Sequence, residues 1–193
     1  VAALYVSGAA SYGLGHYEQA AQALQRYVAL APNDPAGRKL LAATQVRLGN
    51  PDAARAALGN PPETADVEYL ALLGATAALS GDVASGLQYL EQAVLQSPED
   101  ARLRAQLGMM RIAAGDTAQG ELDLSQALEL DPGLANDPRY ESAEITLIQG
   151  YLREAKFDEA LAAIETWKSR HPGDKTGLVM EGVALAGKGD EAG

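Results

Sequence analysis

The sequence contains no cysteine, which excludes disulfide bonds, thiolate nucleophiles and cysteine-ligated metal sites. Aromatic residues are scarce, with one tryptophan, one phenylalanine and eight tyrosines among 193 residues. The β-branched residues that favour strands are also few, since there are nine valines and four isoleucines. Alanine and leucine, which favour helices, number 38 and 27. This composition predicts an all-α protein.

Basic residues are too few for a nucleic-acid partner to be expected. The chain has 15 Lys and Arg against 26 Asp and Glu, a net charge of −11, whereas binding to phosphates needs clustered positive charge. The longest apolar stretch, Tyr69 to Leu79, has 11 residues, short of the roughly 20 that span a bilayer. The chain begins at Val1 with no signal-peptide pattern, which indicates a piece of a longer protein.

A repeat of about 34 residues organises the chain. Its clearest mark is a glycine followed by a polar residue, found at Gly15, Gly49, Gly81, Gly115 and Gly189. The first four lie 34, 32 and 34 residues apart. Glycine ends a helix readily because it adopts positive φ, and Asp or Asn after it caps the next helix. A proline closes most units, at Pro32, Pro98, Pro132 and Pro172.

A unit with a Leu-Gly pair, a small residue after the turn and a terminal proline resembles the tetratricopeptide repeat (TPR). The resemblance implies a right-handed α-solenoid, a TPR superhelix of antiparallel helix pairs, as a single array over residues 1–193. The units are expected at about 1–34, 35–66, 67–100, 101–134, 141–174 and, in part, 175–193. The helices are expected at about 2–14, 17–30, 36–48, 51–58, 67–80, 83–96, 101–114, 117–130, 141–154, 157–170 and 175–187.

Three departures from the repeat carry expectations of their own. The run Gly59-Asn60-Pro61-Pro62 is expected to shorten the second helix of the second unit. The segment Gly133 to Tyr140 is an insertion and is expected to loop out before the fifth unit. The aromatic residue usual near the start of a unit is replaced by Arg38, Arg104 and Glu144, so packing between units is expected to be looser there.

A closer resemblance rests on three segments. Leu147–Arg153, Lys156–Ile164 and Gly182–Asp190 resemble a family of bacterial repeat lipoproteins that accompany exosortase (PEP-CTERM) protein sorting and exopolysaccharide production. This resemblance implies export, a lipid anchor upstream of this piece and a scaffolding role in the periplasm or at the cell envelope. A cytoplasmic location is the alternative.

The residues of an enzyme are not found together in the sequence. The two histidines, His16 and His171, fall in turns of distant units, where polar residues are common. No serine lies in a Gly-x-Ser-x-Gly elbow, and no spacing resembles a calcium-binding loop. We therefore expect no catalysis, no cofactor and no metal.

The TPR resemblance also implies where a partner binds, because the first helix of each TPR unit lines a concave groove. The positions transferred to this sequence include Tyr5, Tyr12, Lys39, Arg47, Arg102, Met109 and Arg153. Four of these are basic, whereas Glu68 is the one acidic residue at the groove positions. One interpretation is a groove for a peptide or protein segment with acidic groups. The alternatives are that the charges only keep an exposed face soluble, and that the tyrosines and Met109 only pack.

The sequence therefore predicts a non-catalytic scaffold that binds a protein or peptide segment, within an exported envelope protein. A cytoplasmic assembly or regulatory adaptor with the same groove is one alternative. An accessory carbohydrate-binding domain of polysaccharide secretion is another, although few aromatic residues are available to stack on sugars. The residues of a chaperone-tail carboxylate clamp are absent from the groove positions. Self-association through exposed ends of the array is also expected.

Overall fold

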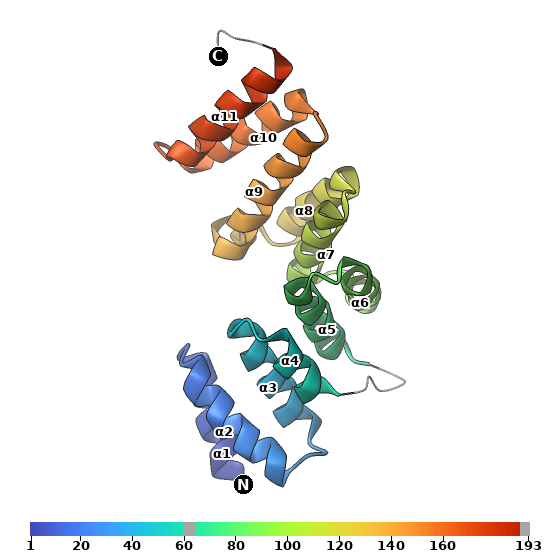
Figure 1. Ribbon diagram of the computed structural model, residues 1–193, viewed down its shortest axis with the longest axis vertical. Helices are drawn as coiled ribbons and strands as arrows, with labels where there is room; N and C mark the ends of the chain where they lie inside the picture. Colours follow the sequence, from blue (N-terminus) through green and yellow to red (C-terminus); the bar gives the residue numbers. More distant parts are fainter. Residues whose placement is uncertain (60–64, 190–193) are drawn as a thin grey trace. The chain divides into compact units, whose positions relative to one another are not determined.

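The computed structural model describes residues 1–59 and 65–189. In that part of the chain the regular structure is entirely helical (Figure 1), which confirms the all-α prediction. The helices are α1 (Ala2–Gly13), α2 (Tyr17–Leu30), α3 (Pro35–Arg47), α4 (Pro51–Leu58), α5 (Val67–Ser80), α6 (Val83–Gln96), α7 (Ala101–Ala114), α8 (Thr117–Leu130), the 3₁₀ helix η1 (Pro132–Asn136), α9 (Pro138–Arg153), α10 (Phe157–Arg170) and α11 (Lys175–Lys188).

Consecutive helices pack as antiparallel pairs, α1 with α2, α3 with α4, α5 with α6, α7 with α8 and α9 with α10. The last helix, α11, packs on α10 and α9. The predicted boundaries agree with these helices to within one residue except at α9, which begins three residues earlier than expected. Helix α4 ends at Leu58, so its predicted shortness is confirmed. Asn60, Pro61 and Pro62 lie outside the described residues, as do residues 190–193.

The chain divides into two compact units, Val1–Ser97 and Pro98–Gly193, each with its own buried residues. In the first unit the core includes Leu24, Leu58 and Leu73. In the second unit one cluster surrounds Ile112 and Leu124, and another contains Ile148, Ile164, Trp167 and Met180. Burial of these side chains is the main stabilising contribution to each unit.

Close approach of the two helices within a hairpin depends on small residues. A Cβ atom on Gly8 would lie 2.6 Å from Leu24 Cγ, and one on Gly74 would lie 2.7 Å from Leu90 Cγ. At Gly108 a Cβ would lie 2.8 Å from the backbone oxygen of Gly120. These distances are shorter than ordinary van der Waals contacts, so the two helices of each hairpin could not approach as closely with larger residues.

Most predicted helix caps are present. The carboxylates of Asp82 and Asp116 accept the backbone N–H groups of Ser85 and Gln119. The expectation that Asn50 caps α4 is wrong, because its side chain makes no cap hydrogen bond and donates to Gln45 Oε1 instead. Pro51 still begins α4, where a missing N–H costs nothing.

The turn glycines have positive φ, from 71° at Gly49 and Gly81 to 91° at Gly115. In the turn between α9 and α10 the corresponding residue is Ala155, with φ of 55°. An L-residue with a side chain pays a steric penalty in this conformation, on the order of 1–2 kcal/mol. The turn between α9 and α10 therefore resembles the glycine turns, but its backbone is strained at Ala155.

The expectation of looser packing between units at Arg38, Arg104 and Glu144 stays a prediction, because the polar contacts of these residues lie within hairpins. Each side chain crosses to the second helix of its own hairpin and makes a polar contact there. Arg104 donates to Gln126 Oε1 at 2.7 Å, and Glu144 pairs with Arg170. Arg38 donates to the backbone oxygens of Ala57 and Leu58. Charged groups replace the aromatic contact because long side chains can reach partners that a ring cannot.

The insertion before the fifth unit does not loop out, contrary to expectation. Residues Pro132–Asn136 form η1, which packs on α8 and α9. Asp131 caps this short helix by accepting the N–H of Gly133 at 2.9 Å, and Leu134 is buried with 5% of its surface exposed. Burial of this one leucine anchors the insertion, and Pro138 then begins α9 at once.

Candidate functional site

The first helices of successive hairpins lie next to one another within each unit. Helix α3 contacts both α1 and α5 in the first unit, and α9 contacts both α7 and α11 in the second. The predicted partner-binding residues lie on these helices. Tyr5, Tyr12, Lys39 and Arg47 belong to the first unit, and Arg102, Met109 and Arg153 belong to the second.

The two tyrosines of α1 are engaged in aromatic contacts. The ring centroid of Tyr5 lies 5.2 Å from that of Tyr27, and the ring centroid of Tyr12 lies 5.5 Å from that of Tyr17. Both side chains are half-buried and pack against the core of the first unit. This arrangement favours packing over ligand binding as their main role.

The charge of Lys39 is compensated by two acidic residues at the start of α5, the neighbouring first helix. Its ammonium donates to Asp66 Oδ2 at 3.0 Å and also pairs with Glu68. The hydrogen bond to Glu68 raises the pKa of Lys39, and Asp66 contributes in the same direction. The pKa of Asp66 is lowered, first by the N–H of Tyr69 and then by Lys39. Lys39 therefore links α3 to α5 and offers little free charge to a partner.

The arginines among the predicted residues are all exposed, and none has a carboxylate partner in the described residues. They are Arg47, Arg102 and Arg153. The guanidinium of Arg47 lies 6.0 Å from the ring centroid of Tyr17, at the outer limit of a cation–π contact. Arg153 donates to the backbone oxygen of Ile112 at 3.2 Å. Arg102 makes no side-chain hydrogen bond in the part of the chain that the structure describes. Charge available to a partner therefore remains at these three positions.

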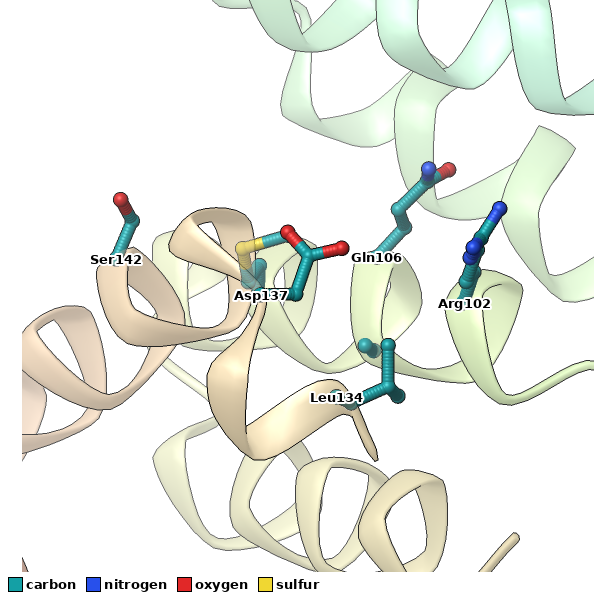
Figure 2. A pocket seen from close by; sticks show the side chains of 7 residues that line it. Arg102, Gln106, Leu134, Asp137 and Ser142 are labelled. Carbon is teal, nitrogen blue, oxygen red and sulfur yellow. The ribbon is translucent and has the colours of Figure 1, made fainter. Parts of the chain in front are cut away.

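A cavity of about 250 Å³ opens beside α7 in the second unit (Figure 2). Two of the predicted residues, Arg102 and Met109, line it together with Ala105, Gln106, Leu134, Asp137 and Ser142. The wall is mainly apolar, and Arg102 and Asp137 supply charged groups of opposite sign there. Leu134 and Asp137 belong to the inserted segment. Because that segment was expected to loop out, these two lining residues were not predicted. The single large apolar side chain within that insertion was the signal that could have revealed them.

Within the described residues no group of three or more His, Asp or Glu side chains could hold a metal ion. Over the same residues, no helix combines the length and apolar character needed to cross a bilayer.

Comparison with known proteins agrees with the helical repeat. Residues 12–75 match the family model of a tetratricopeptide repeat. A thermophilic TPR protein of Thermus thermophilus has 25% sequence identity and a TM-score of 0.63, covering 95% of this chain and 97% of its own. The chain has the tetratricopeptide-repeat fold. No curated protein sequence matches it significantly.

Two further solved structures share the TPR fold at lower identity. A TPR protein of Parabacteroides merdae has 17% identity and a TM-score of 0.71, over 98% of this chain and 73% of that one. The pilF protein of Pseudomonas aeruginosa has 18% identity and a TM-score of 0.67, over 98% of this chain and 85% of that one. TPR domains are generally protein-interaction scaffolds and are typically non-catalytic.

Proposed function

We propose that this TPR chain binds a segment of a partner protein on the face formed by its first helices. The observation that carries the proposal is the cavity beside α7, where an apolar wall meets the guanidinium of Arg102. An apolar side chain of the partner would fill the cavity, and a neighbouring carboxylate would pair with Arg102. Met109 would adapt the wall to the side chain that enters.

The distance between Arg102 and Arg153 indicates how far apart the acidic residues of the partner segment would be. Arg153 is tied to Ile112, which lies ten residues after Arg102 along α7. Ten residues of α-helix span about 15 Å. An extended chain covers that distance in about four to five residues, at roughly 3.3 Å each. The preferred segment is therefore extended and has two acidic residues about four or five positions apart, with an apolar residue near one of them.

Selection from a library of random peptides tests this function whatever the identity of the partner. The intact chain should select peptides that are enriched in Asp and Glu at that spacing. Arg102→Ala and Arg153→Ala should each weaken binding about 5–10-fold and reduce its salt dependence. Arg26→Ala is the matched control, because Arg26 is exposed on a second helix, α2. Selected peptides without acidic residues, or equal binding by all variants, would show that these charges only keep the face soluble.

The carbohydrate alternative has less support from the tyrosines. Sugars stack on exposed rings, whereas Tyr5 and Tyr12 pack against Tyr27 and Tyr17. Binding of an oligosaccharide, in place of a peptide, by the intact chain would favour that alternative.

We further propose an exported setting, in the periplasm or anchored at the cell envelope, with a link to protein sorting or exopolysaccharide production. Its support is the resemblance of Leu147–Arg153, Lys156–Ile164 and Gly182–Asp190 to the bacterial repeat lipoproteins. The sequence upstream of Val1 in the parent gene tests it. A signal peptide ending in a lipid-modified cysteine would support the proposal, and a continuous run of further repeats from the initiator methionine would favour a cytoplasmic adaptor.

A further inference from the structure

The cavity beside α7 holds two charged side chains of opposite sign. Arg102 comes from α7, whereas Asp137 lies between η1 and α9. Figure 2 shows the two on different sides of the cavity, with the carboxylate of Asp137 turned toward α7. Other lining residues, among them Ala105, Met109 and Leu134, are apolar. The cavity therefore offers a positive group, a negative group and an apolar wall together.

The charges of Arg102 and Asp137 do not neutralise each other. Arg102 is exposed and has no carboxylate partner in the part of the chain that the structure describes, and Asp137 is half-buried. A carboxylate that pairs with Arg102 therefore also meets the negative charge of Asp137. Repulsion between like charges is strong where little water separates them. A purely acidic segment is thus an incomplete match to this cavity.

The backbone of Asp137 is fixed by the elements on both sides of it. Its N–H donates to the backbone oxygen of Leu134 at 2.9 Å, and its backbone oxygen accepts the N–H of Glu141, in α9, at 3.1 Å. The inserted segment therefore holds this carboxylate at the cavity. An ionised carboxylate has about four lone-pair sites, so Asp137 can accept a hydrogen bond from an added cation besides those that it accepts within the chain.

We propose that the partner segment also carries a lysine or arginine, two positions before or after the apolar residue that enters the cavity. This preference rests on the proposed binding of a partner segment and specifies its chemistry further. The cation pairs with Asp137 while a carboxylate pairs with Arg102, and the methylene stem of the basic side chain covers Leu134. Side chains two positions apart on an extended chain lie on the same face, roughly 7 Å from one another. The partner is therefore recognised by an acid and a base beside an apolar residue, and not by negative charge alone.

Three versions of one selected acidic peptide test this preference, by fluorescence anisotropy with the intact chain at about 0.15 M salt. They carry lysine, glutamine or glutamate two residues before the apolar residue, and a second set carries them two residues after it. We expect the lysine version to bind about fivefold tighter than the glutamine version in one of the two sets, with the glutamate version weakest there. Equal binding of the lysine and glutamine versions in both sets would overturn the inference.

The variant Asp137→Asn tests whether Asp137 causes the preference. Asparagine begins a helix as well as aspartate does, so the start of α9 is kept. The ratio of lysine to glutamine affinity should fall to about one. Glu129→Gln removes the same charge from an exposed position on α8 outside the cavity, so it should keep the wild-type ratio. An unchanged ratio in Asp137→Asn, or an equal loss in Glu129→Gln, rejects the pairing with Asp137.

Further outcomes distinguish this inference from the proposed function. Peptide binding that depends on Arg102 but shows no preference for lysine overturns the inference alone, whereas absence of any peptide binding overturns both. Free leucine is the small-molecule probe. If it binds saturably and more tightly than the peptides, and loses binding in both Arg102→Ala and Asp137→Asn, the cavity belongs to an amino-acid zwitterion and the peptide is overturned as its ligand.

Discussion

Arg38 Nε lies 2.9 Å from the backbone oxygen of Ala57, so a charged side chain of α3 holds the C-terminal end of α4. The same guanidinium donates to the backbone oxygen of Leu58. Helix α4 has only eight residues and ends at Leu58, and the next residue, Gly59, has a φ of 68°. A Cβ on Gly59 would collide with Arg38 Nη2, so this glycine leaves the space that the arginine occupies. Helix α4 is thus stabilised by a side chain of another helix, α3.

Arg38→Ala should destabilise the chain by about 1–3 kcal/mol, because the last carbonyl groups of α4 lose a charged donor. Chemical denaturation followed by circular dichroism measures the change. Arg26→Ala removes an equally long, exposed side chain from α2 and should stay within about 0.5 kcal/mol of the wild type. Equal stability of the two variants would mean that the Arg38 contacts contribute nothing net.

Ala155→Gly should stabilise the second unit, although a new glycine usually destabilises. Ala155 has a φ of 55°, and a glycine there removes the steric penalty of the Cβ. Part of that gain is offset by the greater freedom of glycine in the unfolded chain, so we expect about 0.5–1 kcal/mol. Gly115→Ala is the reciprocal control, with φ of 91° and open space around the Cβ, and should destabilise by a similar amount. Thermal unfolding of both variants checks the opposite signs.

Gly108→Ala and Gly182→Ala should also shift stability in opposite directions. A Cβ on Gly108 would lie 2.8 Å from the backbone oxygen of Gly120, so α7 and α8 must separate, at a cost of about 1–3 kcal/mol. A Cβ on Gly182 meets nothing within 4 Å, and this glycine lies inside α11. Replacement by alanine there should stabilise the helix by about 0.5–1 kcal/mol. Destabilisation by both variants would show that α11 is also closely approached.

Asp34 should contribute to stability at neutral pH and lose that contribution in acid. The hydrogen bond from the Tyr27 hydroxyl, at 2.6 Å, lowers the pKa of Asp34, and the N–H groups of Gly37 and Ala36 act in the same direction. Because the folded pKa is below the ordinary value of 3.8, the contribution is complete above that pH and is lost as the pH falls through the folded value. Asp34→Asn should therefore be less stable than the wild type at pH 7, and the difference should shrink below pH 3.8. A difference that stays constant with pH would assign the effect to shape and not to charge.

The helices and their order could be predicted from the sequence because the signals are local. Turn glycines such as Gly81 and Gly115, and caps such as Asp82 and Asp116, act within a few residues of themselves. A period of about 34 residues then implies pairs, since no single helix could bury its apolar side alone. Even the small residues at Gly74 and Gly108 could be assigned to close contacts from their place in the repeat.

Contacts between distant residues were decided only by the tertiary structure. Arg38 and Arg104 replace an aromatic residue, and nothing in their local sequence shows which oxygen atoms on the second helix they reach. Leu134 is buried because folding packs η1 on α8 and α9, which the turn-rich sequence around it does not indicate. Lys39 counts as a free charge in the sequence, whereas the fold places Asp66 and Glu68 beside it. Backbone conformation follows from neighbours along the chain, but charge compensation and cavity shape depend on which side chains folding brings together.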